Sequence, residues 1–150
     1  MSNVKYGASK REITEILRSR EINPTAQRVE IAHLLLQEPQ HLSADEIFHK
    51  LNEEYEQVSQ ATVYNTIRLF VEKGVVRELI FSADRIYYDS NTEEHHHFID
   101  TESGRIIDLP AASLSSPDLK KLLNIPDLEE LEVDVSSVSL VIKGKLKPPA

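Results

Sequence analysis

The residues best suited to chemistry in this chain are histidines and aspartates in its second half. The segment Glu93–His97 ends in three consecutive imidazoles. If this segment is a β-strand, His95 and His97 point to one face and His96 to the other, because side chains alternate along a strand. Two imidazoles on one face, one residue apart, form a chelating pair for a divalent metal ion. The spacing therefore predicts a metal site on this strand.

A carboxylate is expected opposite the histidine pair. If residues 101–104 form the turn of a hairpin, His97 faces Asp108. Directly opposed side chains have Cβ atoms about 4.5–5.5 Å apart, so His97 and Asp108 would touch and His95 would lie diagonal to Asp108. Asp89 precedes the histidine run by a short link and can fold over it. Two carboxylates balance the charge of a divalent ion while the imidazoles stay neutral.

The composition narrows the choice of metal. The chain of 150 residues contains no cysteine, which excludes disulfides, cysteine-based zinc sites, iron–sulfur clusters and thiol redox switches. Ligation by nitrogen and oxygen alone suits Fe²⁺ or Mn²⁺; Zn²⁺ also binds such sites and stands above both in the affinity series. The alternative is a solvated histidine-rich strand that binds metal incidentally. His33 and His49 fall in predicted helices and are interpreted as structural or solvated.

Helical patterns fill the first half of the chain. Ser43 and Glu46 form a capping-box pattern at the start of one helix, and Gly74 is a typical residue just beyond the end of another. Apolar residues recur at helical spacing between such signals. Four helices are expected, over residues 8–20, from Thr25 to Glu38, from Ser43 to about Tyr55, and from Ser59 to about Lys73.

Strand patterns begin after the fourth predicted helix. Two β-rich runs around Ser82-Ala83-Asp84 read as a hairpin, and a hairpin that directly follows a helix-turn-helix is the wing of a winged helix. The tail from Gly144 is expected to be disordered. The expected elements are the hairpin strands 75–81 and 85–89, strands 95–100 and 105–109, a helix at about 116–123 and a final strand near 131–143.

The fourth predicted helix has the two faces expected of a DNA-recognition helix. Val63, Ile67, Phe70 and Val71 share one face. The second helix of a helix-turn-helix enters the major groove. Polar residues suited to DNA lie on the outer face and in the basic N-terminal part: Gln60, Asn65 and Arg68 for base edges, Tyr64 for a phosphate or a thymine methyl, and Lys10, Arg11 and Arg28 for the DNA backbone. A solvated helix surface is the alternative.

The charge of the chain is unevenly distributed. The net charge is −8, yet residues 1–28 carry six basic against three acidic side chains, whereas residues 81–150 carry seven basic against thirteen acidic ones. This asymmetry indicates a DNA-facing end and an acidic end with another role. No run approaches the ~20 apolar residues of a membrane helix. The first residues lack the apolar stretch of a secretory signal, so a cytoplasmic protein is expected.

In combination and order, several of these segments resemble the Fur family of metal-dependent transcription regulators, and most closely its peroxide-sensing branch, PerR. The similarity covers about residues 8–145. The matching motifs are Pro24-Thr-Ala-Gln-Arg28, His41-Leu-Ser-Ala-Asp45, Ser59-Gln-Ala-Thr-Val-Tyr-Asn-Thr66, Tyr88-Asp89, His95-His-His97 and Gly104-Arg-Ile-Ile-Asp108.

The resemblance implies an α/β (α+β) fold and a V-shaped homodimer that binds a palindromic operator in double-stranded DNA. Residues 1–89 would form the winged-helix DNA-binding domain, residues 90–94 a hinge, and residues 95–150 the dimerisation and metal-binding domain. A regulatory Fe²⁺ or Mn²⁺ ion would sit between the domains. Its five ligands fall on His41, Asp89, His95, His97 and Asp108.

The resemblance also implies a signal. Iron-sensing members usually have glutamate where this chain has Asp89 and Asp108, whereas peroxide sensors have aspartate. In the peroxide sensors, bound Fe²⁺ reacts with H₂O₂ and a ligand imidazole is oxidised; the targets match His41 and His95. The loss of a ligand weakens metal binding and ends repression, and the Mn²⁺ form is insensitive to peroxide. This mechanism suits a chain without a thiol.

The chain departs from the family pattern in places. Many members bind a structural zinc through two Cys-x-x-Cys pairs; Asp100 and Ser103 stand at the first pair and the second is absent, so that zinc cannot form here. A second family metal site would fall on Glu94 and His96, but Val138 replaces its distal histidine.

Other functions remain as alternatives. The triple histidine also resembles Irr, a haem-controlled branch of the family, and an iron-responsive regulator like Fur itself is a further alternative. A metal-dependent oxygenase or hydrolase would leave the helix-turn-helix unexplained. A DNA-binding module with a merely structural metal would bind its operator independently of metal.

Overall fold

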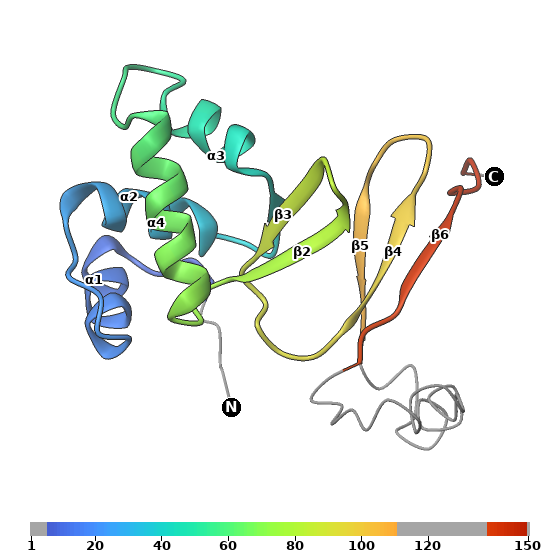
Figure 1. Ribbon diagram of the computed structural model, residues 1–150, viewed down its shortest axis with the longest axis horizontal. Helices are drawn as coiled ribbons and strands as arrows, with labels where there is room; N and C mark the ends of the chain where they lie inside the picture. Colours follow the sequence, from blue (N-terminus) through green and yellow to red (C-terminus); the bar gives the residue numbers. More distant parts are fainter. Residues whose placement is uncertain (1–5, 111–137, 150) are drawn as a thin grey trace. The chain divides into compact units, whose positions relative to one another are not determined.

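The computed structural model describes residues 6–110 and 138–149 and divides into two compact units, Met1–Glu93 and Glu94–Ala150 (Figure 1). All the helices in the described part of the chain lie in the first unit, and each unit contains a three-stranded sheet. The fold is mixed α+β, as predicted from the sequence. Within the described segments, no helix is both long enough and apolar enough to span a bilayer.

Serine and threonine side chains start every helix of the first unit. The hydroxyl of each N-cap residue accepts a hydrogen bond from the backbone N–H three residues later, which satisfies an amide that has no partner within the helix. The predicted capping box of Ser43 and Glu46 is confirmed, and Ser9 and Glu12 form a second one. The helices are α1 (Lys10–Ser19), α2 (Ala26–Leu35), α3 (Ala44–Leu51) and α4 (Gln60–Glu72), capped by Ser9, Thr25, Ser43 and Ser59.

Helix α3 ends earlier than the predicted Tyr55 because a side chain replaces the next helical hydrogen bonds. Asn52 Oδ1 accepts from the backbone amides of Gln57 and Val58 at 2.7 and 3.1 Å. Its Nδ2 donates to the carbonyls of Phe48 and Val58. Asparagine commonly competes with helical bonding in this way. Asn52 therefore closes the loop that leads into α4.

A single apolar core joins the four helices. Ile13 and Leu17 of α1, Ile31 of α2 and Ile47 of α3 are fully buried. The inward face of α4 is buried as predicted: Val63, Ile67 and Phe70 are at most 1 % exposed, and Val71 packs against the core at its edge. Helix α4 is therefore held by its apolar face, and its opposite face is left exposed.

The first sheet consists of β1 (His41–Leu42), β2 (Arg77–Ser82) and β3 (Arg85–Asp89), in the order β1-β3-β2 with antiparallel pairing. The predicted wing hairpin is confirmed. Strand β2 begins at Arg77 rather than residue 75, because the amides of Val75 and Val76 donate to the carbonyl of Phe70 in α4 at 2.8 and 3.4 Å. Strand β1 was not predicted.

The second unit contains β4 (His96–Asp100), β5 (Ile106–Leu109) and β6 (Val141–Gly144), in the order β5-β4-β6. β4 pairs antiparallel with β5, and His97 lies opposite Asp108, so the predicted register is confirmed. β6 runs parallel to β4. The predicted helix 116–123 and residues 131–137 of the predicted final strand lie outside the described residues.

The prediction of a disordered tail from Gly144 is wrong for its first residues. Gly144 belongs to β6 and its carbonyl accepts from the amide of Thr101 at 2.8 Å. The amide of Leu146 donates to Asp100 Oδ1, and Lys145 pairs with Glu102 at 2.7 Å. The turn between β4 and β5 therefore holds this end of the chain.

Candidate functional site

In the first unit, β1 brings a histidine to an aspartate that is far away in the sequence. His41 and Asp89 are direct partners in the antiparallel pairing of β1 with β3. His41 Nε2 lies 3.2 Å from Asp89 Oδ2, and Asp89 Oδ1 accepts from the amide of Asn91 at 2.8 Å. Asp89 is fully buried. The short strand thus gives His41 the position that its sequence spacing could not supply.

In the second unit, one carboxylate oxygen faces two imidazoles. Asp108 Oδ1 lies 3.3 Å from His95 Nε2 and 3.3 Å from His97 Nε2. The two imidazole rings are 4.5 Å apart with an interplanar angle of 61°. One ligand atom from each of the three residues lies within 4.8 Å of the other two. The β4–β5 register therefore assembles the predicted three-residue cluster, and His96 points elsewhere, its Nδ1 accepting from the amide of Leu140 at 3.1 Å.

Both clusters have the chemistry of a divalent metal site. Metal–nitrogen and metal–oxygen bonds of about 2.1 Å separate adjacent ligand atoms by about 3.0–3.4 Å in octahedral or tetrahedral coordination. The measured separations of 3.2 Å in the first unit and 3.3 Å in the second lie in this range. The donors are imidazole nitrogens and carboxylate oxygens, and the chain has no thiolate to offer. These residues fit Fe²⁺, Mn²⁺ or Zn²⁺.

The predicted DNA-reading residues are exposed on α4. Gln60, Tyr64, Asn65 and Arg68 all reach solvent, and Gln60 Nε2 donates to Asp45 Oδ1 at 3.3 Å. Of the residues predicted to contact the DNA backbone, Lys10 forms an ion pair with Glu30, Arg11 is exposed, and Arg28 donates to the carbonyl of Asn23 at 3.0 Å. Their contacts with DNA stay predictions.

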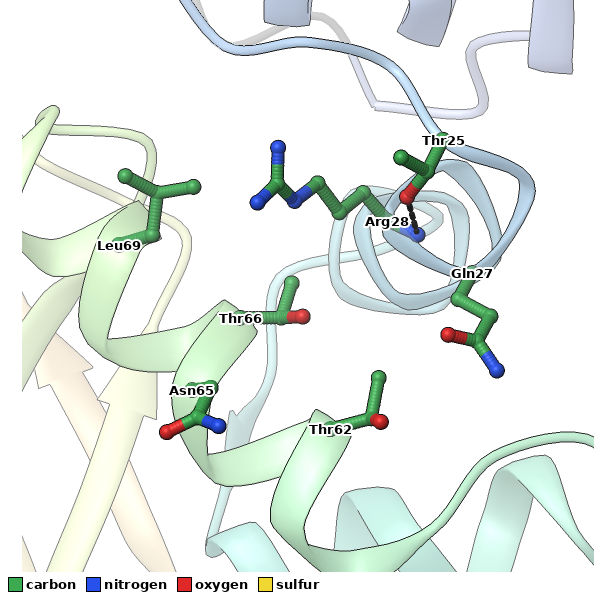
Figure 2. A pocket seen from close by; sticks show the side chains of 7 residues that line it. All are labelled: Thr25, Gln27, Arg28, Thr62, Asn65, Thr66 and Leu69. Carbon is green, nitrogen blue, oxygen red and sulfur yellow. Dashed lines mark hydrogen bonds between the residues drawn. The ribbon is translucent and has the colours of Figure 1, made fainter.

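Sequence reasoning missed a polar pocket beside α4. The pocket has a volume of about 430 Å³ and lies in the first unit between the start of α2 and one flank of α4 (Figure 2). Thr25 as an N-cap, and Thr62 and Thr66 at a spacing of four, were signals that could have indicated it. It is lined by Thr25, Gln27, Arg28, Thr62, Asn65, Thr66 and Leu69.

Comparisons with a family model, with curated proteins and with solved structures all find metal-dependent regulators or PerR. The model of the "Ferric uptake regulator family" matches residues 19–125. The peroxide-responsive repressor PerR of Staphylococcus aureus (strain Mu50 / ATCC 700699) is 35% identical to this chain over 99 residues, which are 66% of this chain and 67% of PerR.

Two solved structures illustrate the similarity in fold. The ferric uptake regulator from Francisella tularensis with iron aligns with a TM-score of 0.67 and 27% identity, covering 84% of this chain and 92% of that one. A zinc-bound manganese uptake regulator aligns with a TM-score of 0.64 and 25% identity, covering 90% and 98%.

Proposed function

The chain belongs to the ferric uptake regulator family, and from this premise we propose that it is a repressor that senses hydrogen peroxide. Members of the family are metal-dependent, DNA-binding transcription regulators; they function as dimers and are not enzymes. Its ligand is a palindromic operator in double-stranded DNA, bound by a homodimer. The metal-loaded form binds the operator, and oxidation of the protein releases it.

The observation that carries the proposal is the position of Asp108 Oδ1, 3.3 Å from both His95 Nε2 and His97 Nε2. A carboxylate shared by two imidazoles is suited to ligating one ion with all three groups. We infer that His41 and Asp89, whose donor atoms lie 3.2 Å apart, complete the coordination of that ion. The resulting five ligands carry two negative charges, which balance Fe²⁺ or Mn²⁺.

His41 is placed to link metal binding to the recognition helix. Only Leu42 and the N-cap Ser43 separate it from α3, and α3 packs against α4. An imidazole held by the ion would fix the start of α3, and therefore the orientation of α4. An oxidised ring whose nitrogen no longer ligates the ion would not do so. The ligand set is thus a proposed mechanical connection between metal binding and DNA binding.

Peroxide is the proposed signal for three reasons. The relatives named PerR are described as peroxide-responsive, and the chain has aspartates, not glutamates, at positions 89 and 108 and no cysteine to act as a redox sensor. His41 and His95 are among the residues that would hold Fe²⁺, and the bound ion would supply the redox chemistry by which hydrogen peroxide transfers one oxygen atom to one of these imidazoles and leaves as water. Mn²⁺ does not support this reaction, so the Mn²⁺ form is expected to stay on DNA.

The test begins with an operator selected from random duplex DNA by the Mn²⁺-loaded protein. Binding to this operator is then measured for the metal-free, Mn²⁺ and Fe²⁺ forms, before and after H₂O₂. We expect tight binding by both metal forms and release of the Fe²⁺ form alone, with one oxygen atom added to His41 or His95 in the mass spectrum. Release of both metal forms, or of neither, would contradict a peroxide signal.

Histidine variants separate the site from the rest of the chain. His97→Ala is expected to lower Mn²⁺ affinity measured by calorimetry and to abolish metal-dependent operator binding. His49→Ala is the matched control, because His49 is exposed on α3 and the centroid of its ring lies 5.4 Å from that of its neighbour Phe48. Equal Mn²⁺ affinity of the two variants would refute the proposed set of metal ligands, even if the protein still bound DNA.

A further inference from the structure

The starts of α3 and α4 are joined by a hydrogen bond between two exposed side chains. Asp45 is the second residue of α3 and Gln60 is the first residue of α4. Gln60 Nε2 donates to Asp45 Oδ1 at 3.3 Å. Because a carboxylate can only accept hydrogen bonds, the amide of Gln60 has to turn its NH₂ group, and not its carbonyl, toward Asp45. The bond therefore decides which hydrogen-bonding groups Gln60 has left.

Gln60 keeps one donor and one acceptor for a partner outside the protein. A glutamine amide has two N–H donors and a carbonyl acceptor, and Asp45 takes one of the donors. In the major groove, adenine presents the acceptor N7 beside the donor N6 amine, whereas guanine presents two acceptors, N7 and O6. A free amide could give both N–H groups to guanine, but Gln60 cannot, because one of them is already bound. The groups that remain match adenine.

The position of Gln60 on its helix suits contact with a base. The N-terminal residues of a recognition helix contact base edges in the major groove. Gln60 is the first residue of α4, and Tyr64 follows four residues later, which places both side chains on one face of the helix. Tyr64 is 47 % exposed, so this face is open to a partner. The amide that Asp45 orients is therefore presented where base edges are read.

We propose that Asp45 is a positioning residue that makes Gln60 specific for adenine, a proposal that rests on the DNA-binding function proposed above. Gln60 accepts a hydrogen bond from the N6 amine of adenine and donates one to N7. Asp45 acts through Gln60: it holds the amide in one orientation, and its negative charge opposes the two acceptors of guanine. Specificity of this kind comes from rejecting the wrong partner, and the carboxylate lowers the affinity for all DNA in return.

The contact with adenine is tested with the full chain loaded with Mn²⁺ and the selected operator. Each adenine is replaced in turn by 7-deazaadenine, which lacks the N7 acceptor, or by 2-aminopurine, which lacks the N6 amine; both analogues still pair with thymine. At one adenine in each half-site, both should weaken the wild-type protein by about two- to tenfold, the value of one hydrogen bond, and neither should weaken Gln60→Ala. The absence of any such adenine would refute the contact.

The role of Asp45 is tested by replacing that adenine with guanine in both half-sites. The wild-type protein is expected to lose about ten- to a hundredfold in affinity per half-site. Asp45→Asn is expected to lose less than about threefold, because the introduced amide can donate to the carbonyl of Gln60 and leave both Gln60 N–H groups for guanine. The same variant should bind an unrelated duplex at least as tightly as the wild type, since a negative charge is removed.

Two further variants show whether the effect comes from the carboxylate at this position. Asp45→Glu keeps the acceptor-only group and should still reject guanine. Glu54→Gln is the matched control, because it removes the same charge from an exposed position in the loop between α3 and α4, and it should discriminate as the wild type does. Circular dichroism melting of each variant shows whether it is folded.

The outcomes distinguish this proposal from the function on which it rests. If Asp45→Asn rejects guanine as strongly as the wild type, Asp45 does not set the specificity of Gln60 and the proposal is overturned. Equal weakening of Asp45→Asn on the adenine and guanine duplexes would also overturn it, because Asp45 would then only support the start of α3. Wild-type binding that does not depend on metal would refute the proposed regulation, yet the base analogues would still decide the contact with adenine.

Discussion

A glycine at the end of α4 permits a close contact whose energy can be measured. Gly74 follows the last residues of α4 with φ of +71°, and the amides of Gly74 and Val75 donate to the carbonyls of Val71 and Phe70 at 3.1 and 2.8 Å. This is a Schellman motif. One nitrogen of Arg20 donates to the carbonyls of Lys73 and Gly74 at 3.2 and 2.9 Å. A Cβ on residue 74 would lie 3.0 Å from that nitrogen.

Two costs are therefore expected for Gly74→Ala. The left-handed backbone costs a residue with a Cβ about 1–2 kcal/mol. Displacement of the guanidinium weakens two hydrogen bonds from a charged donor. Because Arg20 is only partly buried and the two bonds are weakened and not removed, we expect a further loss of about 1 kcal/mol, below the range for a complete hydrogen bond from a charged donor. Gly74→Ala should then lower the free energy of unfolding by about 2–3 kcal/mol in total.

Two controls separate these costs. Gly7 has φ of +72°, and a Cβ added there would meet no atom within 4 Å, so Gly7→Ala should show the backbone cost alone. In an Arg20→Met background, Gly74→Ala should cost about 1 kcal/mol less than in the wild type, beyond the ~0.3–0.5 kcal/mol scatter of independent sites. Urea unfolding followed by circular dichroism measures each value. Equal costs in both backgrounds would refute the coupling between Arg20 and the end of α4.

Two further perturbations test other parts of the fold. Hydrogen bonds from Ser103 and from backbone amides hold the pKa of Asp100 below its ordinary value of 3.8, so the charged form stabilises the fold above that pH and this contribution is lost as pH falls through the lower folded-state pKa. The gap in melting temperature between wild type and Asp100→Asn should therefore shrink from neutral pH to about pH 3, and a constant gap would contradict this. Ser43→Ala should cost about 1 kcal/mol by removing the α3 cap, measured by urea unfolding against Ser19→Ala, which removes a hydroxyl near the end of α1.

The features that the sequence predicted correctly depend on neighbouring residues. The Ser43 and Glu46 capping box needs only a spacing of three, and the pairing of His97 with Asp108 follows from the length of the turn between two adjacent strands. Once that register is fixed, the alternation of side chains places His95 on the same face. Three of the five candidate ligands, His95, His97 and Asp108, could therefore be predicted from local geometry.

The features that were missed depend on contacts that hydrophobic periodicity and capping signals do not describe. Strand β1 has only two residues, too few for any periodicity, and its partner β3 ends 48 residues after His41 in the numbering, at Asp89. The end of α3 depends on Asn52, and the order of residues 144–146 depends on Asp100, because each side chain bonds backbone groups that propensity does not describe. Pairing with a distant strand accounts for β1, and polar side chains that bond backbone groups account for the other two errors.

The same limit applies to α4, where an amphipathic pattern divides a helix into only two faces. Thr66 lies between them: its burial indicates a core residue, whereas its hydroxyl lines a polar pocket. On the proposed function, the exposed face of α4 and the basic side chains before it have different tasks. Gln60 and Arg68 would read base edges, and Arg28 from α2 would hold the DNA backbone. A change at Arg68 should therefore weaken binding to the operator far more than binding to an unrelated duplex, whereas a change at Arg28 should weaken both by a similar factor.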